Sequence, residues 1–396
     1  EIDRRSIMAK YARRVTSFGQ SSIDVMTAIA LEHDCIMLAG GTPGFDAPEG
    51  LLRTAEKYLR KGHNQYTVNR GGKRLRYAIA ENWRAPVGRE IDPETEITIT
   101  CGATEALLDC ALALLDTGDK SVILEPFYEN YRSISLLAEA QPVPVPLLPP
   151  SWEPDFDALE KAAVGARLLI INTPHNPTGA VFSEDALRRI ADISIRNGLF
   201  VMSDETYRTM VFDGDEPNSI ASLPGMAERT AVVGSFSKIM TITGWRVGFF
   251  IAPPEMSSQI RKAHDFASIC APAPFQDAIA EYWPTEDFAD YFQKLMADYR
   301  AKGELLSEAL LHAGFDVTPP KGAYYILADF DRLFPNSDDL EFCEIMARDV
   351  GVSAVGGRAF FSNESGARRY VRFAFAQPMD IIETASDRIR KYFDKR

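Results

Sequence analysis

The chain has 396 residues, of which 46% are apolar and 25% charged, and its formal net charge at pH 7 is −13. This composition indicates a globular protein with two domains or one large domain and an appended lobe, and the negative charge excludes an extended positive surface for nucleic acid or an anionic membrane. Five cysteines without a Cys-x-x-Cys pair predict neither a disulfide framework nor a metal site, and no apolar run approaches the ~18 residues of a membrane span, so we expect a cytoplasmic protein.

The N-terminal part combines helical patterns with a glycine turn. Helical spacing of apolar residues predicts helices over 23–31, 51–61 and 74–83. The apolar run after the first of these helices ends at Gly40 and Gly41, where the missing side chains would let a ligand approach the backbone N–H groups. A plain turn between two parts of the fold is the alternative interpretation.

From residue 96 onward, apolar strand patterns alternate with helix patterns. Strands are predicted at 96–101, 121–125, 143–147, 167–172, 199–202 and 231–234, and helices at 106–115, 133–140, 156–163 and 183–197. Strands that are apolar along their whole length and separated by helices are typical of a parallel sheet covered on both faces. We therefore expect an α/β fold built on a mainly parallel sheet of seven strands.

The last third of the chain predicts a smaller α+β lobe. Helices are expected at 275–282, 288–313, 338–350 and 381–393, and strands near 315–318, 323–329 and 370–376. We expect the N-terminal segment to pack with this lobe. The predicted domains are therefore a large domain over 46–285 and a small domain formed by 1–45 and 286–396.

A turn of small residues follows the strand at 96–101. Gly102, Ala103 and Thr104 open a helix directly after the strand, and the free backbone N–H groups of a helix N-terminus bind anions such as phosphate. The turn lacks the G-x-G-x-x-G spacing of dinucleotide-binding folds. Two interpretations stay open, a phosphate cradle and a purely structural strand-to-helix turn.

Lys238 lies in another turn of small residues, between two apolar runs. Ser235 precedes it and Arg246 follows it. In this setting a lysine could hold an aldehyde cofactor as an imine while its two neighbours bind the cofactor's phosphate. An exposed lysine in a polar loop is the alternative.

Further polar side chains follow the ends of predicted strands. They are Tyr128, Asn176, Asp204 and Tyr207. Because ligands of parallel α/β sheets bind beyond the carboxyl ends of the strands, we expect these side chains to meet near Lys238. A buried carboxylate at Asp204 suits a cationic ring nitrogen. Asn176 and Tyr207 suit a phenolic oxygen, and Tyr128 offers a flat face for a ring. Pyridoxal phosphate has these features.

Four motifs, in their order along the chain, resemble those of the class I/II aminotransferases of the pyridoxal-phosphate fold type I group. They are HNPTG at 175–179, SDETY at 203–207, SFSK at 235–238 with GWR at 244–246, and YVRF at 370–373. The resemblance covers essentially the whole chain. It implies that Lys238 forms the imine, that Asp204 pairs with the ring nitrogen, and that Tyr128 stacks on the ring. Asn176 and Tyr207 would contact the phenolic oxygen. The implied phosphate ligands are Gly102, Ala103, Thr104, Ser235 and Arg246.

The resemblance also implies substrate contacts and a partner subunit. Arg372 is expected to clamp the substrate carboxylate, with help from Asn176 and the backbone of Gly41, because a planar guanidinium suits this task better than an ammonium. Tyr66 is expected to reach the phosphate of the neighbouring subunit. A homodimer with shared active sites follows from that expectation.

A narrower likeness concerns the kynurenine, glutamine and methionine aminotransferase branch. Segments 219–226 and 322–325 carry this likeness. By the same likeness Ile23 is expected to contact the substrate, at a position where the kynurenine branch tends to have an aromatic residue, which counts against a preference for kynurenine.

The expected activity is transfer of the α-amino group of an amino acid to a 2-oxo acid by a ping-pong mechanism. Lys238 would be displaced from the imine by the substrate amine and would then move the α-proton as general base. The family likeness favours neutral, aromatic or sulfur-containing amino acids. A β-eliminating lyase on the same cofactor is the first alternative, since the named residues serve either outcome. A regulatory protein is the second, against which the intact lysine and aspartate count.

Overall fold

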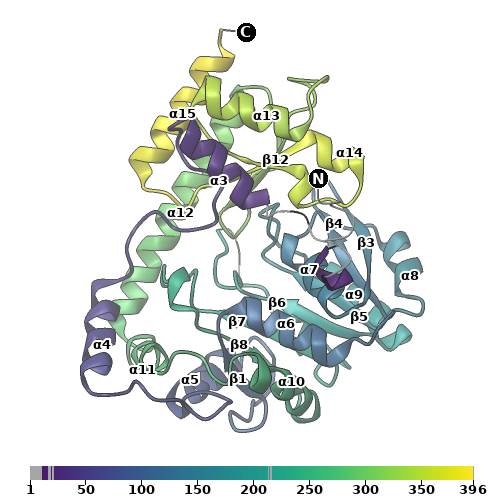
Figure 1. The fold of residues 1–396 in the computed structure, drawn as a ribbon, viewed down its shortest axis with the longest axis vertical. Helices are drawn as coiled ribbons and strands as arrows, with labels where there is room; N and C mark the ends of the chain where they lie inside the picture. Colours follow the sequence, from purple (N-terminus) through teal and green to yellow (C-terminus); the bar gives the residue numbers. More distant parts are fainter. Residues whose placement is uncertain (1–10, 17–18, 20–21, 213, 215, 396) are drawn as a thin grey trace, which may run out of the picture.

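The computed structural model describes residues 11–16, 19, 22–212, 214 and 216–395, and its centre is an eight-stranded sheet (Figure 1). The strand order is β1-β8-β7-β6-β5-β2-β3-β4. The strands span Ile97–Thr100 (β1), Lys120–Glu125 (β2), Gln141–Leu148 (β3), Glu153–Pro154 (β4), Leu168–Asn172 (β5), Phe200–Asp204 (β6), Thr230–Ser235 (β7) and Gly248–Ile251 (β8).

Most neighbouring strands of this sheet are parallel. The strands β2, β3, β5, β6 and β7 pair in parallel, whereas β8 runs antiparallel to both β7 and β1. Because β1 opposes β8, it points the same way as the parallel strands, and the carboxyl ends of β1, β5, β6 and β7 lie at one edge. The mainly parallel sheet is confirmed. Six of its strands were located from the sequence; the other two are β8 and the edge strand β4, so the sheet has one strand more than the expected seven. The two residues of β4 are too few to show a periodic pattern.

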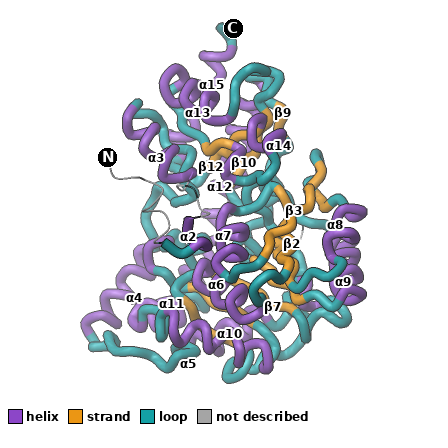
Figure 2. Tube along the Cα trace, turned by 45° about the vertical axis from the view of Figure 1, so that its right-hand side comes forward, coloured by secondary structure: helices purple, strands orange, loops and turns teal. Residues whose placement is uncertain are grey.

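Helices cover both faces of the sheet because side chains alternate along each strand. In β5, Leu168 and Ile170 pack into one apolar cluster with α6, α7 and α10, and Leu169 and Ile171 pack into another that includes α8 and α9. Figure 2 shows strands between α6 and α7 on one side and α8 and α9 on the other. These helices span Ala103–Leu114 (α6), Glu129–Leu137 (α7), Phe156–Ala163 (α8), Glu184–Asn197 (α9) and Pro254–Ala267 (α10).

A second sheet, of four antiparallel strands, is formed by the C-terminal third. Its order is β11-β12-β10-β9, with Asp316–Val317 (β9), Tyr325–Asp329 (β10), Val355–Gly356 (β11) and Tyr370–Ala374 (β12). The long helix α12 contacts β9, β10 and α15. The other helices are Arg13–Thr16 (α2), Ser22–Glu32 (α3), Glu49–Arg60 (α4), Lys73–Trp83 (α5), Ala273–Tyr282 (α11), Glu286–His312 (α12), Asp339–Ile345 (α13), Glu364–Arg369 (α14) and Met379–Phe393 (α15).

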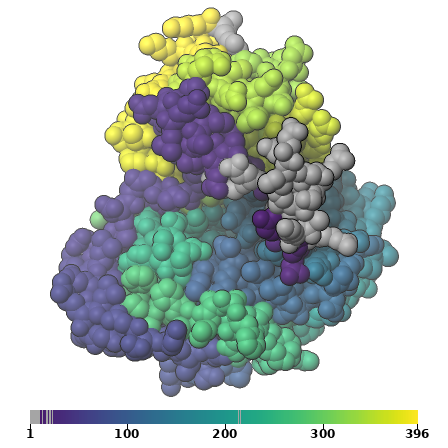
Figure 3. Space-filling view, viewed as in Figure 1, coloured from purple at the N-terminus to yellow at the C-terminus, as the bar shows by residue number. Residues whose placement is uncertain are grey.

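The N-terminal segment lies against this second sheet, as Figure 3 shows for the purple and yellow-green parts of the chain. The backbone N–H of Ile36 donates to the Gly351 carbonyl at 2.9 Å, and its carbonyl accepts from the Ser353 N–H at 2.8 Å. The Ala374 N–H in β12 donates to the Leu38 carbonyl at 2.8 Å. These bonds support our proposal that the N-terminal segment and the C-terminal third form one small domain.

Several helices differ from expectation, and the short helices α2 and α14 were not predicted. α10 was not predicted, because its start at Pro253 and Pro254 reads as a break, although proline is well tolerated in the first helical turn. The single helix expected over 338–350 ends at Ile345 and continues as a π-helical turn, Met346–Val350. Within the described part of the chain, no helix is both long and apolar enough to cross a membrane.

Candidate active site

A cavity of about 570 Å³ lies at the edge where the carboxyl ends of the parallel strands meet. The polar ends of β5, β6 and β7 and the start of α6 face it on one side, and residues from the N-terminal segment, β10 and β12 face it on the other. Residues predicted for the site that line this cavity are Gly41, Ala103, Thr104, Tyr128, Asn176, Asp204, Tyr207, Ser235, Lys238, Arg246 and Arg372.

The N-terminus of α6 and the side chain of Arg246 form one end of the cavity. Gly102 caps the helix with φ 79°, in the left-handed region that favours glycine. A Cβ at Gly102 would also collide with the Arg246 guanidinium. Arg246 donates to the Cys101 carbonyl at 3.3 Å, which holds it beside the free N–H groups of the first helical turn. The cation and these N–H groups make an anion site.

Lys238 reaches into the cavity from the turn after β7. Its Nζ donates to the Gly41 carbonyl at 3.1 Å. Burial lowers the pKa of the Lys238 amine, although the neighbouring Tyr325 opposes this shift. A lowered pKa favours the neutral amine, the form that attacks a carbonyl carbon or accepts a proton.

Asp204 ends β6 and is 5% exposed. Its Oδ2 accepts from the Tyr131 hydroxyl at 2.7 Å, and its Oδ1 accepts from the Thr206 N–H at 3.1 Å. Burial raises the pKa of Asp204 despite these hydrogen bonds. The carboxylate is therefore a favourable partner for a cation brought into the cavity.

Asn172, the last residue of β5, connects two of the predicted side chains. Its Nδ2 donates to the Asp204 carbonyl and its Oδ1 accepts from the Asn176 N–H, both at 2.8 Å. The two strand ends are thus tied together, and the loop that carries Asn176 is held over the cavity.

Arg372 approaches from β12 with 1% of its surface exposed. It donates to the Asn176 side-chain oxygen at 3.0 Å and to the Ala39 carbonyl at 2.9 Å. Its guanidinium lies 4.5 Å from the ring centroid of Tyr325 and 4.8 Å from that of Phe360. In the described part of the structure its Nε has no hydrogen-bond partner. A flat, oriented guanidinium with free N–H groups suits a carboxylate ligand.

Three predicted residues stand apart from the cavity wall. Gly102 does not line the cavity but caps α6, whose first turn does. Tyr66 does not line the cavity and is 78% exposed on the loop after α4. Ile23 belongs to α3, and its side chain lies outside the described part of the structure.

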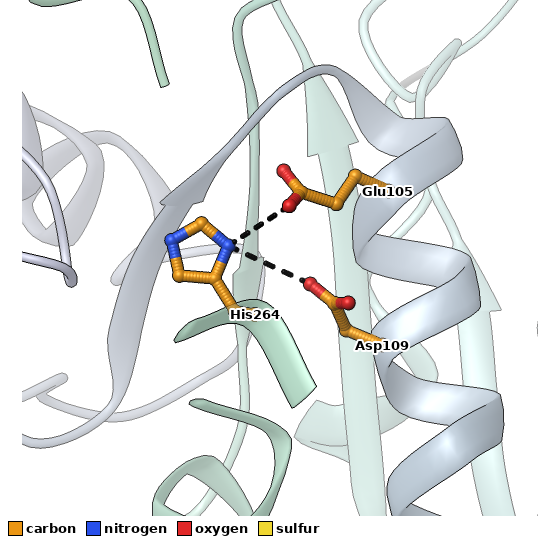
Figure 4. A group of neighbouring side chains, drawn as sticks. All are labelled: Glu105, Asp109 and His264. Carbon is orange, nitrogen blue, oxygen red and sulfur yellow. Dashed lines mark hydrogen bonds and ion pairs between the residues drawn. The ribbon is translucent and has the colours of Figure 1, made fainter. Parts of the chain in front are cut away.

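A buried ionic cluster joins α6 and α10 (Figure 4). His264 of α10 faces Glu105 and Asp109 of α6, with its Nδ1 at 3.1 Å from Glu105 and 3.6 Å from Asp109. Its Nε2 lies 2.8 Å from the Asn69 carbonyl. Burial lowers the pKa of His264, but the hydrogen bonds and charges of Asp109 and Glu105 outweigh it and raise this pKa to about 10. We interpret the cluster as an imidazolium between two carboxylates.

This cluster is tied to the anion site through Glu105. The carboxylate of Glu105 accepts from the backbone N–H of Cys101, and the Cys101 carbonyl in turn accepts from Arg246. The cluster therefore fixes the turn between β1 and α6. A ring nitrogen of His264 and one carboxylate oxygen each of Glu105 and Asp109 lie within 4.8 Å of one another.

Several cavity residues were missed by sequence reasoning. Asn172 ends a strand, and the strand-end rule applied to every polar residue would have found it. Tyr131 lies three residues after Tyr128 on the same helical face, which is a usable signal. Tyr325 faces Tyr207 with a hydroxyl separation of 3.0 Å, but it lies in the other sheet and no local pattern predicts this contact.

Comparison with protein families defines the class of the chain. The model of the family "Aminotransferase class I and II" matches residues 33–389, and the chain belongs to this family. It is a pyridoxal-phosphate-dependent aminotransferase, and the resemblance and the fold class inferred from sequence are confirmed.

Individual relatives cover nearly the whole chain. It is 36% identical over 387 residues to the probable N-succinyldiaminopimelate aminotransferase of Mycobacterium tuberculosis, which covers 95% of this chain and 97% of that protein. The solved structure of an N-succinyldiaminopimelate aminotransferase from that organism matches with a TM-score of 0.91 over 96% of this chain and all of that one. The methionine aminotransferase of Escherichia coli is 31% identical, covering 96% of this chain and 97% of its own length. Such relatives favour amino-group transfer over the lyase alternative.

Proposed function

We propose that this aminotransferase acts on neutral α-amino acids, with pyridoxal phosphate held between the two sheets. The single observation that carries the proposal is the meeting of four groups in one cavity: a lysine amine, a buried carboxylate, an anion site and a flat guanidinium. They are Lys238, Asp204, the α6 N-terminus with Arg246, and Arg372.

The residues present fit the cofactor. The anion site matches its phosphate, with Ala103, Thr104, Ser235 and Arg246 as ligands. The buried carboxylate of Asp204 matches a protonated ring nitrogen, which would offset the unfavourable burial of that anion. Tyr131 and Thr206 keep this carboxylate oriented. The amide nitrogen of Asn176 remains available to a ring oxygen, because its Oδ1 already accepts from Arg372.

When bound, pyridoxal phosphate supplies an electron-accepting ring that stabilises negative charge at the substrate's α-carbon. Lys238 would hold the cofactor covalently and, once released, would accept the α-proton at Nζ and pass it to the cofactor carbon. Arg372 and the backbone of Gly41 orient the substrate carboxylate. The oxo acid formed from the first substrate leaves before the second substrate binds, which is the ping-pong order.

The charge of the cavity supports neutral substrates. Its cationic side chains among the described residues are Lys238, Arg246 and Arg372, and each has a role above. None of these described cationic side chains remains for a second carboxylate on the substrate. The substrate side chain would instead meet residues such as Met37, Leu107 and Gln377, which suits aromatic or sulfur-containing amino acids.

We further propose a homodimer in the cytoplasm. Apolar side chains are exposed on the loop after α4 and at the end of α10, with Phe266 94% and Val68 58% exposed. The two segments are neighbours, since Asn69 donates to Asp265 at 2.8 Å. Exposed apolar groups of this kind support a subunit contact, and Tyr66 on the same loop would then reach the partner's phosphate. The free cysteines support a reducing compartment.

The experiment compares the native protein with K238A and with K262A, which removes an exposed lysine of α10 bound to Gln259. Turnover is measured on a panel of amino donors that includes methionine, phenylalanine, kynurenine, aspartate and N-succinyldiaminopimelate. We expect K238A to lose roughly 10³-fold or more of kcat, and K262A to lose none. The proposal fails if K238A retains turnover, and the substrate assignment fails if aspartate or N-succinyldiaminopimelate, which carry additional carboxylates, are preferred.

A further inference from the structure

A second phenol lies beside Tyr207 in the cavity. Tyr325 opens β10, is 2% exposed and lines the same cavity. Its hydroxyl lies 3.0 Å from that of Tyr207, with the ring planes at 85°. Two phenols carried by different parts of the fold therefore meet hydroxyl to hydroxyl.

The position of the Tyr325 hydroxyl is fixed by its surroundings. It packs so closely on Gly41 that a Cβ at that glycine would collide with it. The Arg372 guanidinium covers the ring. The Gly41 carbonyl is held in turn by the Tyr324 hydroxyl at 2.8 Å and by Lys238 at 3.1 Å. Tyr325 is thus confined between Gly41 and Arg372, next to the carbonyl that Lys238 contacts.

The two phenols share one hydrogen bond, and its direction decides what Tyr207 can do. Each hydroxyl has one proton to donate and can also accept. If Tyr325 donates to Tyr207, the proton of Tyr207 remains available to a third group in the cavity. If Tyr207 donates to Tyr325, that proton is already used. A hydroxyl that accepts a hydrogen bond also becomes a stronger donor.

We infer that Tyr325 is a positioning residue that donates its proton to Tyr207 and so directs the proton of Tyr207 toward the ring oxygen of bound pyridoxal phosphate. The inference rests on the proposed function, because it needs the cofactor in this cavity. A firm donation from Tyr207 stabilises negative charge on that ring oxygen. It therefore favours the unprotonated form of the covalent link to Lys238 and lowers the apparent pKa of the bound chromophore.

The test is a pH titration of the cofactor absorbance in the holoenzyme, for the native protein, Y325F, Y207F and the double variant. Y325F removes only the donating hydroxyl, and we expect the apparent pKa to rise by about 0.5 to 1 unit. Y207F should raise it further, and Y325F should add nothing in the Y207F background, because Tyr325 acts through Tyr207. Y299F is the control, since it removes a buried hydroxyl that has no hydrogen-bond partner among the described residues.

An unchanged pKa in Y325F, an equal shift in Y299F, or a full Y325F effect without the Tyr207 hydroxyl would each overturn the inference. The proposed function fails separately, if the native protein takes up no cofactor. A G41A variant gives a second measure: its Cβ should displace the Tyr325 hydroxyl and raise the pKa, and Y325F should relieve the collision so that G41A/Y325F binds cofactor as Y325F does. If G41A leaves the native pKa in place, Tyr325 does not hold Tyr207.

Discussion

Raising the pH from 7 to 9 should destabilise this protein, and His264 should make the largest contribution. The folded-state pKa of His264 is about 10, against an ordinary value of 6.5. A histidine whose pKa is raised by folding contributes stability that is complete below its unfolded pKa and is lost as the pH rises through the folded pKa. The relevant window is therefore pH 6.5 to 10, in which the folded chain keeps a proton that the unfolded chain has released.

The magnitude follows from that one proton. Between pH 7 and 9 the free energy of unfolding should fall by about 1.4 kcal/mol per pH unit from His264, or on the order of 2 to 3 kcal/mol in total. The partners of His264 titrate below this window, since burial raises the pKa of Asp109 only to about 6 and the pKa of Glu105 is lowered. Buried thiols such as Cys110, whose pKa is raised by burial, also lower the free energy of unfolding as the pH approaches 9. Their contribution must be subtracted from the measured change.

Urea unfolding followed by circular dichroism at pH 7, 8 and 9 measures this slope. The protein concentration is held constant because association changes apparent stability. The native protein is compared with H264Q, which has the same thiols. H312Q is the control, because it removes an exposed histidine ring that contacts Asp394. The free energy of unfolding should fall with pH more steeply in the native protein than in H264Q, by the amount that corresponds to about one bound proton. H312Q should show the native pH dependence. Equal slopes in the native protein and H264Q would refute the buried imidazolium.

Two further predictions concern the substrate clamp and the subunit contact. R372K keeps the charge but loses the planar geometry, so KM for the amino donor should rise roughly 10- to 100-fold, as for the loss of one charge-assisted hydrogen bond. The cofactor absorbance of the free enzyme should stay native. An unchanged KM would show that Arg372 does not bind the substrate. K238A and Y66F subunits should each have impaired activity and should regain activity when they are mixed and refolded together. One site of the mixed dimer then combines Lys238 of the Y66F subunit with Tyr66 of the K238A subunit. If Tyr66 acts within its own subunit, mixing should give no recovery.

The part of the site that depends on local chain order could be predicted from the sequence. Parallel strands place their carboxyl ends at one edge, so any polar residue that follows such a strand is delivered to that edge. This rule predicted Asn176, Asp204 and Lys238, all of which line the cavity. It also predicted the α6 N-terminus, although the helix begins at Ala103, three residues earlier than the apolar pattern suggested. The helix start matters because it brings the free N–H groups directly to the turn.

The remaining features depend on contacts between distant parts of the chain. His264 and Glu105 are 159 residues apart, and neither position shows a pattern that links them. His264 lies in α10, a helix that was not predicted, so the imidazolium cluster was not foreseeable. Tyr325 was placed correctly in a strand, but its approach to Tyr207 depends on how the two sheets face each other, which periodicity does not encode.

The way the two sheets meet decides whether the site is complete. Lys238, Asp204 and Asn176 come from the eight-stranded sheet, whereas Gly41, Arg372 and Tyr325 come from the N-terminal segment and the four-stranded sheet. Hydrogen bonds join the two groups directly: Lys238 to Gly41, Asn176 to Arg372, and Tyr207 to Tyr325. Each pair couples a residue proposed to hold the cofactor with one that orients the substrate or the phenol pair. A relative shift of the two parts by a hydrogen-bond length would break all three contacts while leaving each sheet intact. The chemistry therefore depends on this junction, and substitutions at the junction such as G41A should affect catalysis more than folding.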